Sequence, residues 1–140
     1  MLTGCCWGCL PSSRLLTPDV KAALALTDRV LLDIKYTDSD LYKTHVGCDM
    51  DRVLSFLSYL QERQIPTTVR QVIIPTLNDT EENVRALKAI ADAHSNVDKI
   101  ELLPFRKICQ VKYDKMNLPF RFRHIPEPTR ETMAGLEKIL

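Results

Sequence analysis

The sequence predicts an α/β fold in which a parallel sheet of about three βα units forms part of a TIM-like β/α barrel. Three short apolar segments, residues 29–35, 67–74 and 99–103, are predicted as buried strands. Their centres lie about 30 to 40 residues apart, as in βα repeats, and helical patterns fill the intervals. Near-continuous apolar strands indicate a parallel sheet covered by helices, and the right-handed crossover rule supports that arrangement.

The first helix is expected after Thr17, an N-cap residue followed by Pro18, which suits the first helical position. The strand at 29–35 is then followed by a short helix. A longer helix over residues 49–64 carries apolar residues at helical spacing, and Pro66 stops it before the second strand.

The next helix is expected over residues 78–93, with Asn78 as N-cap and Glu81 reaching back to it in a capping box. After the third strand, residues 106–128 are rich in Pro, Phe and Arg and are predicted as a long loop. Thr129 can cap a last helix. We therefore divide the chain into an irregular Cys-rich segment, residues 1–16, and part of a β/α barrel, residues 17–140.

Composition excludes several classes of protein. The 140 residues include 19 basic and 18 acidic ones, so the net charge of +1 predicts no nucleic-acid partner. No apolar run approaches the roughly 18 residues of a membrane span, and the N-terminus is not a signal peptide. Five cysteines, an odd number with three within five residues, do not suit a secreted disulfide framework and favour the cytoplasm.

A binding site is expected at the carboxyl ends of the strands, where β/α proteins hold their ligands. Asp33 and Lys35 share one face at the end of the first strand, Arg70 lies inside the second, and Arg106 and Lys107 follow the third. One carboxylate and several cations suit a zwitterionic or anionic ligand.

Purely structural interpretations stand beside this one. Asp33 and Lys35 can form a local ion pair at a strand end. Arg70 needs a carboxylate because an unpaired buried charge is costly, and Glu101 on the next strand is a candidate partner. Arg106 and Lys107 can be solvated loop charges.

The cysteines allow two interpretations as well. Cys5, Cys6 and Cys9 include a C-x2-C pair, and His45 and Cys48 are spaced like metal ligands. A zinc or thiol site at Cys5–Cys9 is the weaker hypothesis, because no second C-x2-C pair follows. A loop with buried or incidental thiols is the commoner arrangement. We predict no metal ligand in this chain.

An ordered set of short motifs resembles the C-terminal half of the pyruvate formate-lyase activating enzyme family, in the radical S-adenosylmethionine superfamily. The resemblance runs from about Leu26 to Leu140. The motifs are Leu32-Asp33-Ile34-Lys35, Val46-Gly47, Gln64-Ile65-Pro66, Val69-Arg70 through Pro75, Asn78-Asp79, Val97 through Pro104, and Pro126 through Thr129.

The resemblance implies a glycyl-radical enzyme activase, an oxidoreductase built on an incomplete parallel β/α barrel. Such an enzyme cleaves S-adenosylmethionine reductively with a [4Fe–4S] cluster and removes a hydrogen from the Cα of a glycine in its partner, a glycyl radical enzyme such as pyruvate formate-lyase. The implied electron donor is a flavodoxin or ferredoxin-type reductant. S-adenosylmethionine and the cluster are the implied cofactors.

Residue by residue, the resemblance places cofactor-binding residues at Asp33, Ile34, Lys35 and Arg70. The family often has a histidine after Leu-Pro-Tyr that approaches the cofactor. Arg106 occupies that position here and is the fifth predicted cofactor-binding residue, because an arginine can donate to a carboxylate or ribose oxygen. The family's C-x3-C-x2-C loop is missing, because Ser12 stands where the third cysteine is needed after Cys5 and Cys9.

The missing loop leads us to expect a truncated chain, a fragment that is inactive alone and supplies no catalytic residue of its own. The alternative is a non-catalytic binding or regulatory fragment, which docks on a glycyl radical enzyme or on a separate N-terminal half.

Overall fold

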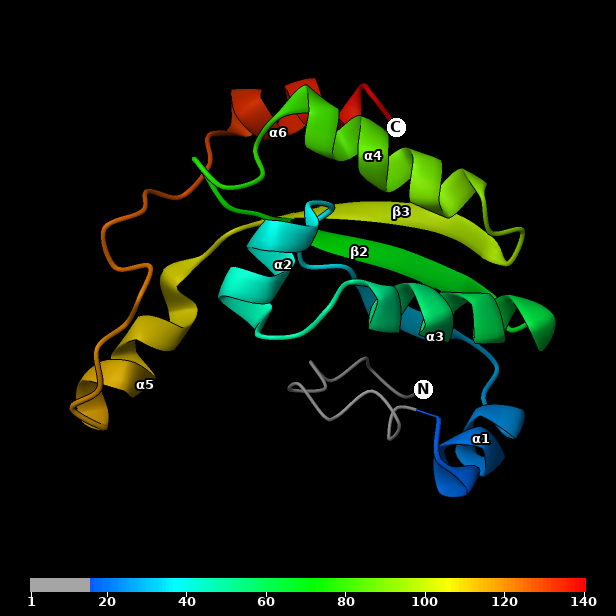
Figure 1. Cartoon of the computed structure of the whole chain (residues 1–140). Coiled ribbons are helices and arrows are strands. Elements are labelled where there is room, and N and C mark those ends of the chain that lie inside the picture. The colour runs from blue at the N-terminus through cyan, green and yellow to red at the C-terminus, as the bar shows by residue number, and fades with distance from the viewer. Residues whose placement is uncertain (1–15) are drawn as a thin grey trace.

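The computed structural model describes residues 16–140. The three predicted strands form one parallel sheet in the order β1-β2-β3, and helices alternate with them (Figure 1). The elements in chain order are α1 (Pro18–Ala25), β1 (Val30–Asp33), α2 (Ser39–Val46), α3 (Asp51–Glu62), β2 (Thr67–Ile73), α4 (Glu81–Asp92), β3 (Val97–Pro104), η2 (Lys107–Cys109), α5 (Gln110–Lys115) and α6 (Arg130–Glu137). The predicted α/β class and parallel sheet are confirmed.

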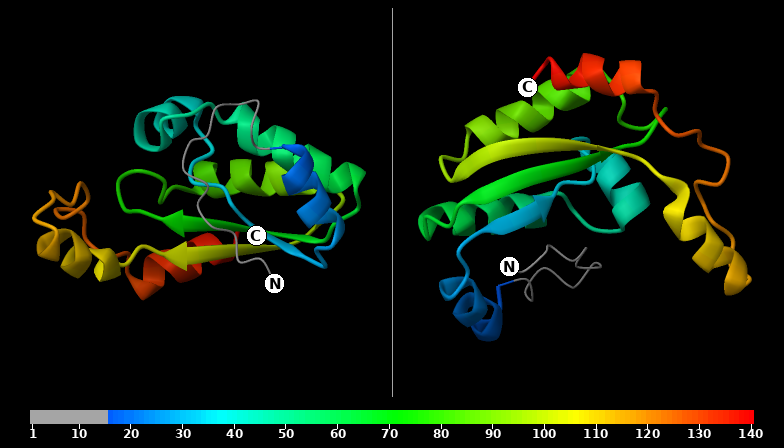
Figure 2. Two further views of the ribbon diagram at one scale, coloured as in Figure 1. Left: turned by 90° about the horizontal axis from the view of Figure 1, so that it is seen from below. Right: turned by 180° about the vertical axis from the view of Figure 1, so that it is seen from behind.

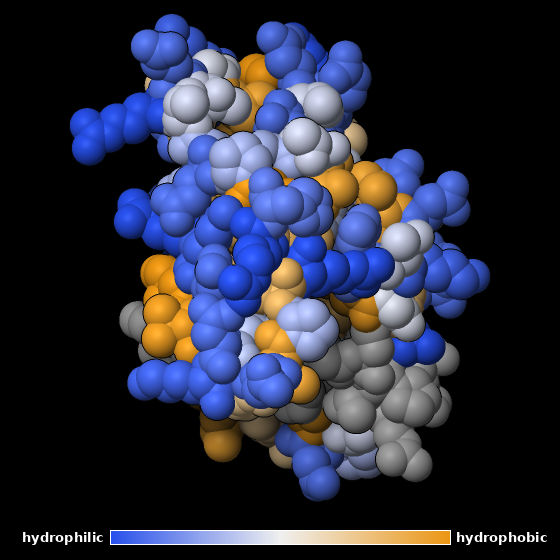
Figure 3. All heavy atoms as spheres, turned by 90° about the vertical axis from the view of Figure 1, so that its left-hand side faces the viewer, coloured by the Kyte–Doolittle hydropathy of each residue, from blue (hydrophilic) through white to orange (hydrophobic). Residues whose placement is uncertain are grey.

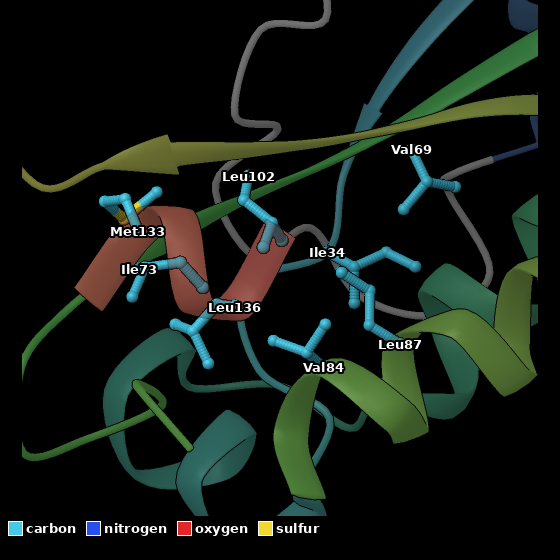
Figure 4. Close-up of a cluster of buried hydrophobic side chains, with 8 residues drawn as sticks. All are labelled: Ile34, Val69, Ile73, Val84, Leu87, Leu102, Met133 and Leu136. Carbon is cyan, nitrogen blue, oxygen red and sulfur yellow. The ribbon is translucent and has the colours of Figure 1, made fainter. Parts of the chain in front are cut away.

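Helices cover one face of the sheet. In the view from behind, the strands lie in front of α3 and α4 (Figure 2, right). Alternate side chains of the strands point to this covered face and meet the apolar sides of α4 and α6 (Figure 4). This cluster holds Ile34, Val69, Ile73, Val84, Leu87, Leu102, Met133 and Leu136. The side chains that alternate with these core residues along the strands point to the opposite face of the sheet.

Several predicted helix signals act as expected. Thr17 accepts a hydrogen bond from the backbone N–H of Val20, with Pro18 at the first helical position. Thr129 does the same for Thr132 at the start of α6. Each threonine satisfies one of the otherwise free amides of a first helical turn.

The prediction that Asn78 caps a helix over 78–93 is wrong. α4 begins at Glu81, and Thr80 is its N-cap, accepting from the backbone N–H of Asn83 at 3.2 Å. Asn78 is buried in the turn before the helix. The hydroxyl of Thr80 therefore caps the helix, because the side-chain amide of Asn78 makes hydrogen bonds to the backbone of Val72 and Ile74 within the turn.

The long loop predicted over 106–128 is only partly a loop. It contains the short helices η2 and α5, and its later part folds back on the body. Phe120 and Ile125 are buried in an apolar cluster with Phe105, which anchors the segment to the end of β3. The proposed boundary between residues 1–16 and 17–140 stays a prediction.

Candidate functional site

Charged side chains cross the sheet in one row. The parallel register places Asp33 of β1 opposite Arg70 of β2, and Arg70 opposite Glu101 of β3. Val69 and Gln71, the neighbours of Arg70, are buried, and Val69 packs in the cluster under the helices. Because side chains alternate along a strand, the charged row lies on the face away from α4.

Asp33, at the β1 end of this row, accepts hydrogen bonds from two cations. Arg70 donates from Nε to Asp33 Oδ1 at 2.9 Å, and Lys35 donates from Nζ to Asp33 Oδ2 at 3.3 Å. The three side chains are partly exposed, at 19%, 22% and 29% for Asp33, Arg70 and Lys35. One carboxylate shared by two cations leaves a local excess of positive charge, which favours a bound anion.

The partner of Arg70 differs from the structural candidate. Glu101 lies opposite Arg70 in register but accepts a hydrogen bond from Lys99 Nζ at 2.6 Å. Arg70 contacts Asp33 through Nε, and its terminal nitrogens have no acceptor among the described residues. Two terminal nitrogens in a fixed plane can hold the two oxygens of a ligand carboxylate.

The expected local ion pair between Asp33 and Lys35 is present, so the structural interpretation of these two residues also describes a real contact. It does not exclude a binding role, because both side chains remain partly open to solvent on the same face as Arg70.

Asn78 is a supporting residue that sequence reasoning assigned to a different task. Its Oδ1 accepts from the backbone N–H of Ile74 at 2.6 Å. Its Nδ2 donates to the carbonyl of Val72 at 2.9 Å and to the carbonyl of Lys35 at 3.3 Å. Asn78 therefore ties the carboxyl end of β2 to the backbone just after β1, beside the Asp33 pair. In the sequence, an Asn two residues before a capping threonine carries no signal that distinguishes this role from that of a helix N-cap.

Two predicted site residues are placed differently from the other three. Ile34 is fully buried in the cluster under the helices, although its backbone N–H donates to the carbonyl of Arg70. Its side chain belongs to the core, so only its backbone faces the site. Arg106 is exposed after β3, and in the described part of the chain no hydrogen bond or ion pair joins it to Asp33, Lys35 or Arg70.

Lys107, the neighbour of Arg106, is engaged elsewhere. It donates from Nζ to the carbonyl of Arg123 at 2.7 Å, and its backbone N–H donates to Glu127. These bonds fold the segment after β3 upon itself, so Lys107 is more than a solvated loop charge.

Aromatic side chains line the end of β1 beyond the charged row. Tyr36 is buried and lies 5.4 Å from the ring of His45, which lies 6.0 Å from Phe122. Burial raises the pKa of Tyr36, while the positive charge of Arg121 acts in the opposite direction. His45 is thus packed among rings.

The structure bears on metal binding only in part. Cys5, Cys6 and Cys9 lie outside the described residues. Across residues 16–140, no group of three or more His, Cys, Asp or Glu side chains comes together in a way that could hold a metal ion. Over the same range, no helix has both the length and the apolar character to cross a membrane.

The chain is similar in sequence to known activating enzymes. It is 40% identical over 114 residues to the pyruvate formate-lyase-activating enzyme of Clostridium pasteurianum, covering 81% of this chain and 48% of that protein. It is 29% identical over 123 residues to the pyruvate formate-lyase 1-activating enzyme of Escherichia coli K12, covering 88% of this chain and 50% of that protein. The chain spans about half the length of the curated relatives it matches. No protein-family model matches it.

A solved structure has the same fold. It is the crystal structure of a domain of pyruvate-formate lyase-activating enzyme from Bacteroides vulgatus, with a TM-score of 0.71 and 18% sequence identity. The match covers 92% of this chain and 71% of that one. The arrangement of helices and parallel strands is consistent with the predicted partial β/α barrel.

Proposed function

We propose that this chain, a relative of the pyruvate formate-lyase-activating enzymes over most of its length, supplies the S-adenosylmethionine-binding part of a glycyl-radical enzyme activase. The observation that carries the proposal is the contact of Asp33 with both Arg70 and Lys35 on the face of the sheet opposite α4. The proposal has three parts, which are the identity of the ligand, the partner enzyme and the reaction.

The residues present fit the amino-acid end of S-adenosylmethionine. The terminal nitrogens of Arg70 are available for a ligand carboxylate, and Lys35 adds a second cation. The carboxylates of Asp33 and Glu101 can accept hydrogen bonds from an ammonium or from hydroxyl groups. When bound, S-adenosylmethionine supplies the radical chemistry of hydrogen abstraction. The contribution of this chain is to hold that ligand in one orientation.

The described residues do not fit a [4Fe–4S] cluster, because residues 16–140 bring together no set of three ligating side chains. We therefore assign the described residues a binding and orienting role. The proposal includes a glycyl radical enzyme such as pyruvate formate-lyase as partner, a flavodoxin or ferredoxin-type reductant, and a cytoplasmic location.

Calorimetric titration of the chain with S-adenosylmethionine tests the site. Replacing Arg70 by Met keeps much of the side-chain length and removes the guanidinium, so we expect affinity to fall at least roughly tenfold. Arg85→Met is the matched control, because Arg85 only pairs with Glu81 on the exposed side of α4. Equal affinity of the unaltered chain and the Arg70 variant would overturn this assignment.

A second candidate function is a non-catalytic docking fragment. It is favoured by the exposed hydrophobic side chains of Ile108, Val111, Met116 and Leu118. It predicts association with pyruvate formate-lyase, or with a separately encoded half, without turnover.

Binding of S-adenosylmethionine separates the two candidates, and anaerobic reconstitution with iron and sulfide tests the expectation, common to both, that the chain is inactive alone. Formation of 5′-deoxyadenosine from S-adenosylmethionine above background supports a complete activase and contradicts our expectation that the chain is inactive alone. Recovery of the partner in a pull-down, with no binding of S-adenosylmethionine in the calorimetric titration, supports the docking function.

A further inference from the structure

Exposed apolar side chains are concentrated in one short segment. Among the described residues, five large hydrophobic side chains are exposed, and four of them lie within residues 107–118, which we call the α5 arm. These four are Ile108, Val111, Met116 and Leu118, and the fifth is Leu26. In all three views of Figures 1 and 2, α5 lies away from the sheet and its covering helices.

The α5 arm is held in a defined place. Tyr113 and Phe120 lie with ring centroids 5.3 Å apart, and Phe120 packs edge-on against Phe122 at 6.2 Å. The backbone N–H of Leu118 donates to the carbonyl of Tyr113 at 2.9 Å. Tyr113 therefore packs against the aromatic residues that follow the arm, and this packing fixes the position of the helix that carries the exposed apolar side chains.

Charge distinguishes this segment from the rest of the chain. Residues 106–128 carry six Lys or Arg and two Asp or Glu, although the whole chain is nearly neutral. One of the two acids, Asp114, is paired with Arg123. Lys112 and Lys115 are exposed on α5. A basic surface in a chain whose remainder is net acidic attracts partners of opposite charge.

Apolar and basic side chains share this face of the molecule. Figure 3 views the molecule from the side on which the α5 arm lies, and apolar patches alternate there with hydrophilic groups. Large exposed apolar side chains rimmed by charge are typical of a protein–protein contact. The four exposed hydrophobic side chains favour a protein partner over a nucleic acid, because a phosphate backbone offers them no apolar contact.

The position of the α5 arm relates it to the candidate site. The backbone N–H of Phe105 donates to the carbonyl of Ile73, so the chain leaves β3 beside the carboxyl end of β2. The arm starts two residues later, on the side of the sheet to which the strands carrying Asp33 and Arg70 run. A polypeptide bound to the arm is thus kept close to the carboxyl ends of the strands.

We propose that the α5 arm is a docking surface for an acidic, apolar-bearing face of a protein partner. This inference rests on the proposed function in one respect, because it identifies that partner as the glycyl radical enzyme. The exposed apolar residues form the hydrophobic part of the interface with the partner. Lys112 and Lys115 attract the acidic side chains of the partner and fix its orientation on the arm.

The test measures binding of purified pyruvate formate-lyase to the full chain by biolayer interferometry at two salt concentrations. Lys112→Glu/Lys115→Glu is expected to weaken binding roughly tenfold and to reduce its salt dependence. Arg130→Glu/Lys138→Glu is the matched control, because it changes the net charge equally at two exposed positions on or beside α6.

A second pair of variants tests the apolar part. Ile108→Ser/Val111→Ser removes two exposed side chains and is expected to weaken binding, whereas Leu26→Ser, at an 89% exposed position far along the chain, is expected to leave it unchanged. Circular dichroism melting of each variant establishes that the fold is retained. Equal binding by arm and control variants overturns the inference, as does equal weakening by both.

The two proposals fail in different ways. If the unaltered chain binds S-adenosylmethionine but not pyruvate formate-lyase, the docking inference is overturned and the cofactor site stands. If it binds pyruvate formate-lyase through the arm but does not bind S-adenosylmethionine, the cofactor assignment fails and the docking surface stands. Arm-dependent self-association in light scattering, or arm-dependent binding of single-stranded DNA or anionic vesicles without binding of pyruvate formate-lyase, identifies another occupant and overturns the inference.

Discussion

Asp33 receives hydrogen bonds from cations on two different chain segments, and this sharing is the main chemical feature of the site. A single surface pair between Asp33 and Lys35 contributes little to stability. Arg70 adds a second strand to the contact and aligns a guanidinium with the carboxylate. The arrangement fixes the positions of three partly exposed side chains, and such fixed positions favour the binding of a small zwitterionic ligand.

Asn78 is predicted to contribute strongly to stability. Replacing it by Ala removes hydrogen bonds to Ile74, Val72 and Lys35, and the buried backbone N–H of Ile74 loses its side-chain acceptor. We expect the free energy of unfolding to fall by about 3 kcal/mol. Urea denaturation followed by circular dichroism measures the change.

Asn78→Asp separates the two halves of that side chain. The Asp variant keeps the acceptor for Ile74 but loses both donors and places a carboxylate beside two carbonyl oxygens. It is expected to destabilise the fold at least as much as Asn78→Ala near neutral pH. Gln110→Ala, which removes an amide with no side-chain hydrogen bond among the described residues, serves as the control. A loss below about 0.5 kcal/mol for both Asn78 variants would contradict the assigned role.

At the scale of the elements, the sequence predicts those helices and strands whose formation depends on interactions between residues close in the chain. The threonines at 17 and 129 cap the helices that follow them, and the apolar runs form the three strands. The charged residues Asp33, Lys35 and Arg70 come together as expected, because parallel register and side-chain alternation follow from the strand order.

Contacts between distant segments account for what the sequence did not predict. Asn78 is drawn into the turn by the carbonyl of Lys35, 43 positions earlier, which no local pattern reveals. The segment that contains the two short helices within 106–128 returns to the body through Phe120 and Ile125, which pack in one apolar cluster with Phe105. Arg106 is predicted as a ligand contact from its place after β3, but its side chain is exposed, and in the described part of the chain no hydrogen bond or ion pair joins it to Asp33, Lys35 or Arg70.

Replacing each of two glycines by alanine is expected to change the free energy of unfolding in opposite directions. Gly47 ends α2 in the left-handed region at φ 80°, and its N–H donates to the carbonyl of Lys43. A Cβ there is strained, so Gly47→Ala is expected to lower the free energy of unfolding by about 1 kcal/mol.

Gly135 is the matched position. It lies inside α6, and an added Cβ would meet nothing within 4 Å. Gly135→Ala is expected to raise the free energy of unfolding by about 0.5 to 1 kcal/mol, because alanine loses less backbone entropy in a helix. Thermal and urea denaturation of the two variants measure the difference, and changes of the same sign would contradict the assignment.

At the scale of the whole molecule, the two ends of the sheet hold different polar structures. The candidate site occupies the row of Asp33 and Arg70, whereas the amino ends of the strands are joined by Arg29. Its guanidinium donates to Thr68 Oγ1 at 3.0 Å and to both carboxylate oxygens of Asp98 at 2.7 and 2.5 Å. One side chain therefore links the starts of β1, β2 and β3, away from the proposed ligand.

The hydrogen bonds from Arg29 to Thr68 and Asp98, which we call the Arg29 clamp, predict a specific dependence of stability on pH. The hydrogen bond from Arg29 holds the pKa of Asp98 below its usual value of 3.8. The folded protein thus binds a proton on Asp98 less readily than the unfolded chain does. The stabilisation is fully present above the unfolded pKa and is lost as the pH falls through the lower folded pKa. Asp98→Asn is therefore expected to lower stability at neutral pH and to reduce the loss of stability on acidification.

Urea denaturation at neutral and acidic pH measures this linkage, with Asp92→Asn as the control. Asp92 is exposed at the end of α4, and the described residues offer it no ion pair, so its replacement removes the same charge without opening the clamp. The two variants should differ at neutral pH and converge in acid, because protonation of Asp98 in the control protein weakens the same bond that the Asn removes. A constant difference between them across that range would show that the charge of Asp98 does not hold the three strand starts together.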